Sequence, residues 1–203
     1  MLELSPSQYA FVRPLFEEMD FHLPLAAVLA GDVSAPIYVD ALDPPRCALT
    51  WTGYRFYLTG APAGEETLAA AQKVFQEIYR PLSLARGGEV YGLFPSPAWE
   101  KGVESMFGEL APIREERQYY ALKENRYDWR AMLPEGFELC WVEAGLLAEK
   151  RIKNPEYLTE EMLSERASVE EFLQKSFGVC LIHADEIVGW CLSEYNTGDR
   201  CEV

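Results

Sequence analysis

The chain has 203 residues, of which 49% are hydrophobic and 13% aromatic, enough to build the core of one large domain or two small ones. Its net charge of −15, from 33 acidic against 18 basic residues, disfavours binding to nucleic acid or to an anionic membrane surface. No apolar run approaches the roughly 20 residues of a membrane-spanning helix, and the first residues lack the parts of a signal peptide. We therefore expect a cytoplasmic protein that binds neither nucleic acid nor membrane.

Residues 7–30 predict two short helices. The apolar face of the first has members at helical spacing, namely Tyr9, Val12, Phe16 and Met19. Residues 36–39 then predict a short strand. Residues 47–52 and 54–58 predict a hairpin that closes near Gly53.

Residues 65–80 predict the longest helix, which has acidic residues in its first turn and should end at Arg80-Pro81. A strand at residues 89–94, a helix at residues 97–110 and a strand at residues 113–122 follow. These elements predict an N-terminal α+β domain over residues 1–124.

Residues 125–136 are polar, contain Pro134-Glu135-Gly136, and predict a linker before a second unit at residues 137–203. That unit opens with a strand at residues 137–142. Two helices follow, with start signals at Asn154-Pro155 and Thr159 and a capping box at residues 168–171.

Residues 177–203 predict a three-strand meander that completes the second unit. Apolar runs at residues 177–183 and 187–192 flank a short polar connection of hairpin length. A second turn at residues 196–199 leads into a strand that begins at residues 201–203. The whole chain thus predicts an α+β fold, with mixed, mainly antiparallel sheets and helices packed on them.

The last strand begins where the sequence ends. An unfinished strand leaves unpaired backbone groups and an uncovered apolar face, so we expect a truncated protein. An exposed final strand can also pair with a partner or with a second copy of the chain, which predicts a possible homodimer through this edge.

Few residues are available for metal binding or for histidine-based catalysis. The five cysteines have no paired short spacing, and His22 and His183 are the only histidines. We therefore predict no metal site. A disulfide between Cys180 and Cys191 would need a hairpin turn at residues 185–186, and a reducing compartment argues against it.

The segment Asp185-Glu186-Ile187-Val188-Gly189, within residues 177–193, carries a family resemblance. Together with residues 198–203, it resembles the GNAT superfamily of acyl-CoA-dependent N-acetyltransferases, in which this phrase marks the hairpin between the second and third strands. Residues 51–60 are similar to the N-terminal region of a GNAT subgroup whose catalytic domain follows a domain of partial GNAT character. The resemblance implies a GNAT-like fold, possibly in tandem.

The same resemblance implies transfer of an acetyl group from acetyl-CoA to a primary amine of a small molecule or peptide, without a covalent enzyme intermediate. It implies that Glu202 is the general base and that Val203 lies near the backbone N–H that holds the thioester carbonyl. The acceptor-lining positions that it implies are Ser193, Glu194 and Tyr195. The glycine-rich loop with which the family binds the pyrophosphate of acetyl-CoA does not occur in these 203 residues.

Simpler interpretations remain open for each of these features. Glu202 can be an ordinary strand residue, and residues 193–195 can be the place where a strand leaves the core. Trp190 is typical of a core residue, and the acidic run at residues 160–171 is typical of a solvated helix face. A non-catalytic GNAT-like binding module is the alternative function.

Overall fold

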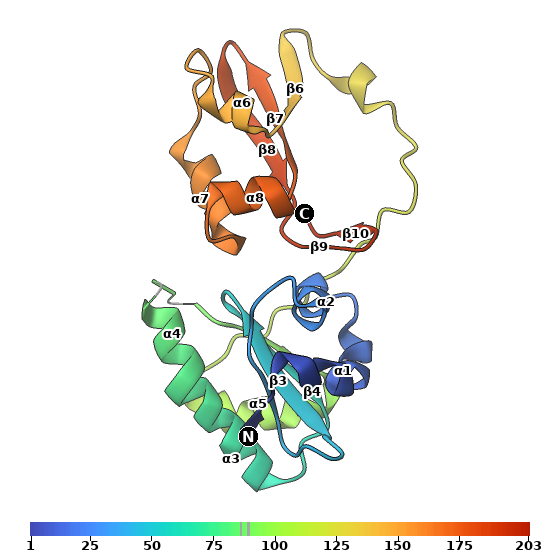
Figure 1. Ribbon diagram of the computed structural model, residues 1–203, viewed down its shortest axis with the longest axis vertical. Coiled ribbons are helices and arrows are strands. Elements are labelled where there is room, and N and C mark those ends of the chain that lie inside the picture. Colours follow the sequence, from blue (N-terminus) through green and yellow to red (C-terminus); the bar gives the residue numbers. More distant parts are fainter. Residues whose placement is uncertain (86, 89) are drawn as a thin grey trace. The chain divides into compact units, whose positions relative to one another are not determined.

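Sheets with helices packed on them organise both halves of the chain in this computed structural model, which describes residues 1–85, 87–88 and 90–203. The chain divides into two units, Met1–Arg117 and Gln118–Val203, each described by itself below (Figure 1). The predicted α+β class is confirmed. The predicted domain boundaries at residues 124 and 136 stay a prediction. Among the described residues, no helix combines the length and the hydrophobicity that crossing a bilayer requires.

A five-stranded sheet of order β1-β2-β3-β4-β5 forms the centre of the first unit. Its strands are β1 (Leu2–Glu3), β2 (Ile37–Val39), β3 (Cys47–Thr52), β4 (Arg55–Gly60) and β5 (Gly92–Pro95). Neighbouring strands are antiparallel except β5, which joins β4 in parallel. The predicted hairpin is confirmed: Thr52 pairs with Arg55, and Gly53 occupies the first loop position with a φ of 51°, a conformation that favours glycine.

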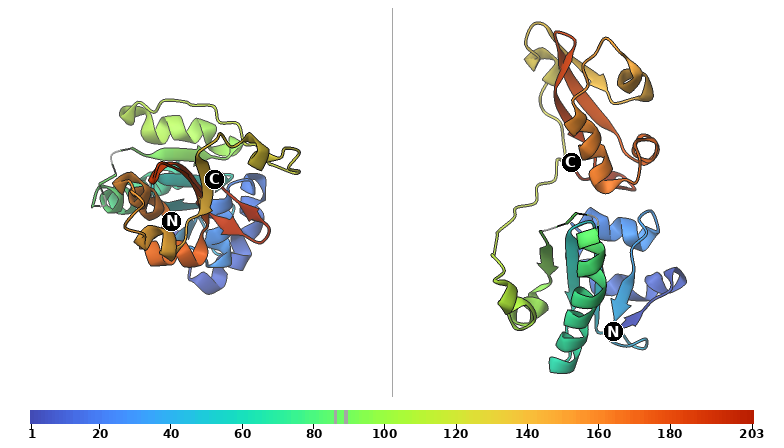
Figure 2. Two further views of the ribbon diagram at one scale, coloured as in Figure 1. Left: turned by 90° about the horizontal axis from the view of Figure 1, so that it is seen from above. Right: turned by 90° about the vertical axis from the view of Figure 1, so that its left-hand side faces the viewer.

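Helices cover both faces of this sheet (Figures 1 and 2). One face carries α1 (Tyr9–Val12), a 3-10 helix (Arg13–Met19) and α2 (Leu23–Ala30), and the other carries α3 (Glu65–Val74), α4 (Arg80–Ala85) and α5 (Glu100–Phe107). The predicted apolar face of the first helical segment is buried as expected. Because successive strand residues point to opposite faces, each strand contributes to two separate cores.

The helix that begins at Glu65 does not end at Arg80-Pro81, so that prediction is wrong. A π-helical turn, Phe75–Tyr79, follows α3, and α4 continues the helix through Pro81 to Ala85. The backbone N–H of Arg80 donates to the carbonyl of Phe75. Hydrogen bonding has therefore already shifted out of the α pattern just before the proline, which makes the missing proline N–H tolerable there.

The strand predicted at residues 113–122 is also wrong, because this segment is extended but pairs with no strand of the described structure. Ile113, Tyr120 and Leu122 are 87%, 86% and 86% exposed. β-branched and aromatic residues favour a strand only where a neighbouring strand supplies backbone partners and a packed face. Of the strand predicted at residues 89–94, Glu89 lies outside the described residues and β5 begins at Gly92.

In the second unit, the strands β6 (Phe137–Trp141), β7 (Gly178–His183) and β8 (Glu186–Leu192) form an antiparallel sheet in that order. The strands β9 (Asn196–Thr197) and β10 (Arg200–Cys201) form a separate hairpin. The helices are α6 (Ala144–Ala148), α7 (Glu156–Glu165) and α8 (Val169–Lys175). A 3-10 helix, Trp129–Met132, lies within the predicted linker.

The predicted helix starts of this unit are partly confirmed. The Ser168 hydroxyl caps α8 by accepting the N–H of Glu171 at 3.2 Å, as the capping box predicts. Thr159 lies inside α7 instead of starting a helix, because Pro155 already occupies the N-cap position. The short helix α6 was not predicted.

The β7–β8 hairpin turns at Ala184-Asp185, one residue earlier than the Cys180–Cys191 disulfide would require. Both turn residues have positive φ, 50° and 62°, as a two-residue type I′ turn needs. The register then shifts by one residue between Leu181 and Ile182, so that Cys180 pairs with Trp190 and Cys191 pairs with Val179. Cys180 is buried and Cys191 is exposed, so their thiols lie on opposite faces of the sheet, and both are free.

His22 is buried in the first unit among the rings of Phe21, Tyr57 and Phe94, whose centroids lie 4.4, 5.3 and 5.2 Å away. Burial, together with the smaller effect of the nearby positive charges of Arg55 and Arg117, lowers the pKa of His22 to about 4. The imidazole is therefore neutral in the folded protein at pH 5 and above.

Acidification is expected to destabilise the first unit through this histidine. Between pH 6.5 and 4 the unfolded chain binds the proton and the folded chain does not, so the free energy of unfolding falls as pH falls. The His22 contribution between pH 7 and 5.5 is about 1 kcal/mol. Urea denaturation at both pH values measures it, and a His22→Gln variant should lose this part of the pH dependence. An unchanged dependence in the variant would contradict the assignment.

Candidate functional site

The five candidate residues come together at the end of the chain's last sheet. Glu194 donates its backbone N–H to the carbonyl of Glu202, and Glu202 donates its own to the carbonyl of Tyr195, both at 2.8 Å. The segment that follows β8 therefore pairs with the segment that follows β10. The predicted third strand thus pairs with residues 194–197 and not with β8 itself.

Ser193 is buried and ties two segments of backbone together. It is 3% exposed, its N–H donates to the carbonyl of Phe177 at 2.8 Å, and its hydroxyl oxygen accepts the Phe177 N–H at 2.9 Å. The side-chain amide of Asn196 donates to the same hydroxyl at 3.3 Å. Ser193 therefore positions the end of β8, and its hydroxyl is occupied by these contacts.

Tyr195 is likewise buried, with 2% of its surface exposed, and the Arg166 guanidinium lies 5.9 Å from the centre of its ring. Glu202 is half-buried, and its Oε2 atom is inaccessible to solvent. Val203, by contrast, is 72% exposed. The five predicted residues thus differ strongly in solvent exposure, and therefore in how accessible they are to a ligand.

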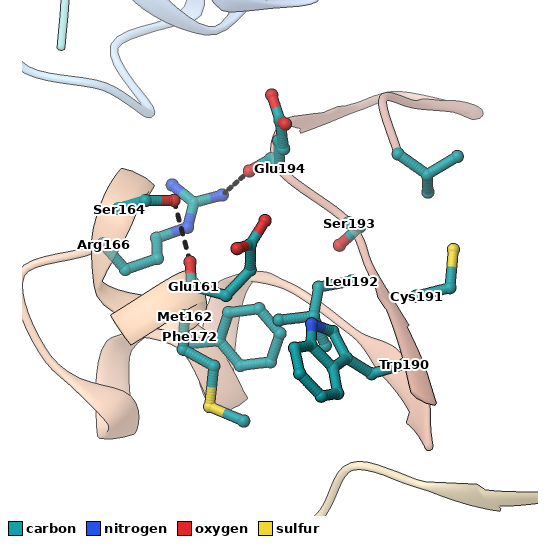
Figure 3. A pocket seen from close by; sticks show the side chains of 11 residues that line it. Glu161, Met162, Ser164, Arg166, Phe172, Trp190, Cys191, Leu192, Ser193 and Glu194 are labelled. Carbon is teal, nitrogen blue, oxygen red and sulfur yellow. Dashed lines mark hydrogen bonds between the residues drawn. The ribbon is translucent and has the colours of Figure 1, made fainter. Parts of the chain in front are cut away.

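A pocket of about 230 Å³ lies between α7, α8 and the end of β8 (Figure 3). Of the five predicted residues, Ser193, Glu194 and Val203 line it, whereas Tyr195 and Glu202 are not among its lining residues. Its apolar wall consists of the side chains Met162, Phe172, Trp190 and Leu192. Phe172 and Met162 belong to the core beneath, and Trp190 is half-buried with a surface facing the pocket.

Charged groups stand at the other side of the pocket. Arg166 follows α7 and is held by two hydrogen bonds: its Nε donates to the Ser176 hydroxyl at 2.9 Å, and its Nη2 donates to the Glu194 carbonyl at 3.1 Å. Glu161, on α7, directs its carboxylate toward the space between Arg166 and Leu192 (Figure 3). The pocket therefore presents both a fixed cation and a carboxylate to a ligand.

Sequence reasoning missed the residues of this pocket outside the β8 end. Trp190 was interpreted as core and Glu161 as part of a solvated helix face, although both line the pocket. One signal was available for Arg166, which is the only basic residue between residues 154 and 174. A single arginine inside an acidic helical segment is a candidate for a positioned charge.

Comparisons with known proteins give one answer. A family model described as GNAT acetyltransferase matches residues 13–203. A solved structure, that of a GCN5-related N-acetyltransferase-like protein from Streptococcus suis 89/1591, matches with a TM-score of 0.59 and 21% identity over 97% of this chain and 74% of that chain. No curated protein matches. The structural match supports the GNAT fold, and the family model shows that the chain belongs to the GNAT acetyltransferase family.

Proposed function

We propose that the protein acts in the transfer of an acetyl group from acetyl-CoA to a primary amine, and that the pocket between α7 and the end of β8 holds the amine. The observation that carries this proposal is a small pocket with a carboxylate rim and an apolar wall, located beside the predicted site residues in a chain of the GNAT family. The overall charge of −15 adds a field that attracts cationic amines.

An amine acceptor arrives as an ammonium ion at neutral pH and is not a nucleophile until it loses a proton. The carboxylate of Glu161, which points into the pocket (Figure 3), would attract the ammonium. Glu202 is the proposed base, because its backbone pairs directly with Glu194 and Tyr195 at the pocket's edge. In this proposal its carboxylate takes the proton from the ammonium through an intervening water, because Glu202 does not itself line the pocket.

The pocket does not fit acetyl-CoA itself. Its volume of about 230 Å³ is below the roughly 300–1,000 Å³ typical of pockets for drug-sized ligands, and the cosubstrate is larger than those. A pyrophosphate in the pocket would also face the carboxylate of Glu161 (Figure 3). We therefore assign the pocket to the acceptor alone.

Calorimetric titration of the 203-residue protein with acetyl-CoA tests the proposal first. Micromolar binding would mean that another segment or a second chain completes the cofactor site, and incubation with a panel of primary amines should then yield products heavier by one acetyl group in a mass spectrum. Failure to bind acetyl-CoA would remove the enzymatic proposal for this chain and favour the alternative, a non-catalytic GNAT-like module.

A further inference from the structure

We propose that the acceptor bound in the α7–β8 pocket is a free α-amino acid with an apolar side chain, held as a zwitterion. This inference rests on the proposed function, because it names the substrate class of the same site. Three features of the pocket carry it: the fork of Arg166, the carboxylate of Glu161 and the apolar wall that includes Trp190.

Arg166 is placed to bind a carboxylate. Its guanidinium has five N–H donors, and the bonds to Ser176 and Glu194 use two of them while holding the planar group at the pocket's edge. A group held in this way loses little rotamer entropy when a ligand binds. Arginine forks match carboxylates in a bidentate geometry, which a lysine cannot reproduce.

Glu161 supplies the opposite charge within the same pocket. Its carboxylate points into the space next to Arg166 (Figure 3), and no salt bridge between the two is found among the described residues. A ligand that carries an ammonium and a carboxylate on one carbon can satisfy both groups together. A simple amine would leave the remaining N–H donors of Arg166 without an acceptor on the ligand.

The apolar wall and the volume limit what the rest of the ligand can be. Trp190, Leu192 and the edge of Phe172 present an apolar surface, which favours an aliphatic or aromatic side chain over a charged one. A volume of about 230 Å³ suits a molecule the size of a single amino acid. It is too small for an aminoglycoside-sized antibiotic or for several residues of a peptide.

Ligand-observed NMR with the full 203-residue chain tests the inference without acetyl-CoA. The probes are L-phenylalanine, phenethylamine, which lacks the carboxylate, and 3-phenylpropanoate, which lacks the amine. L-phenylalanine is expected to bind at least about tenfold more tightly than either analogue, since each lacks one charge-assisted contact. Equal binding of phenethylamine and L-phenylalanine would overturn the inference.

Matched variants assign the two charges. Glu161→Gln is expected to weaken the binding of L-phenylalanine and of phenethylamine about tenfold. The binding of 3-phenylpropanoate should not become weaker. Glu160→Gln is the control, because Glu160 is an exposed neighbour on the same helix that does not line the pocket. An equal effect of both variants would mean that overall charge acts and not a site, which would overturn the inference.

Arg166→Lys keeps the charge but removes the fork. This variant is expected to weaken the binding of L-phenylalanine and of 3-phenylpropanoate about tenfold and to leave the binding of phenethylamine unchanged. Because Arg166 also holds Ser176 and Glu194, the thermal midpoint of the variant is measured as well, and binding is compared at a temperature at which both proteins are folded. If phenethylamine loses as much affinity as the amino acid, the carboxylate role of Arg166 is wrong.

Failure of the inference and failure of the proposed function are distinguishable. If L-phenylalanine binds as described but the protein neither binds acetyl-CoA nor yields an N-acetyl product, the amino-acid site stands and the transferase proposal falls. If the protein acetylates phenethylamine with the same kcat/KM as L-phenylalanine, the transferase proposal stands and the amino-acid inference is overturned.

Discussion

Glu202→Gln is expected to lower kcat for acetyl transfer to an amine about 100-fold to 10,000-fold. Glutamine has nearly the same shape as glutamate but cannot take a proton from the ammonium, and general base catalysis is typically worth this factor. The backbone contacts of Glu202 to Glu194 and Tyr195 do not involve the side chain, so the pairing of the two segments should persist in the variant. Steady-state kinetics with the amine at saturation measure the loss.

The control for Glu202→Gln is Asp199→Asn, which removes the same charge from the exposed turn between β9 and β10. The control should keep kcat within a factor of about two, because an exposed charge on a turn acts on the site only through screened electrostatics. A Glu202→Gln enzyme with wild-type kcat would show that another group accepts the proton. A raised KM with unchanged kcat would instead indicate a role in binding.

Trp99→Ala is expected to lower the free energy of unfolding of the first unit by about 3–5 kcal/mol. Trp99 is fully buried in the core between the sheet and the helices α3, the π-helical turn and α5, and its Nε1–H donates to the Thr59 carbonyl at 2.9 Å. The substitution opens a cavity in this core and leaves a buried carbonyl of β4 without its donor. A loss of this size is a large part of the stability of an ordinary domain.

Urea denaturation followed by circular dichroism measures the effect of Trp99→Ala, with Phe11→Ala as control. Phe11 is an aromatic residue of the same unit that is 72% exposed, so its replacement should change the free energy of unfolding by no more than about 0.5 kcal/mol. A loss below about 1 kcal/mol for Trp99→Ala would show that the core closes around the missing ring.

Local sequence signals predicted strands and helices correctly where the contacts that stabilise them lie within a few residues. The hairpin around Gly53 and the capped start of α8 at Ser168 each depend on contacts within a few residues. The strand prediction for residues 113–122 was wrong because it depended on a distant contact. A strand-forming composition gives a strand only beside a neighbouring strand, and the local sequence does not show whether one is present.

The sequence likewise indicated some features of the candidate site and not others. Family resemblance indicated residues 193–195 and 202–203. Backbone hydrogen bonds join Glu194 and Tyr195 to Glu202, and Ser193, Glu194 and Val203 line one pocket. It did not indicate that Ser193 and Tyr195 are buried, or that Arg166 and Glu161 line the adjacent pocket. Those facts depend on how α7 packs against β8 across about 30 residues of intervening sequence.

Apolar periodicity and turn chemistry in the sequence predicted the fold class and the local turns and caps, because these signals act over short distances. The GNAT family was indicated separately, by the resemblance of residues 177–203. Only the tertiary structure decided which side chains share a pocket. Arg166 becomes a positioned cation when Ser176 and the Glu194 carbonyl hold its guanidinium, and Trp190 lines the pocket because the helices leave one side of it uncovered. Both outcomes depend on packing between elements distant in sequence, which no local pattern encodes.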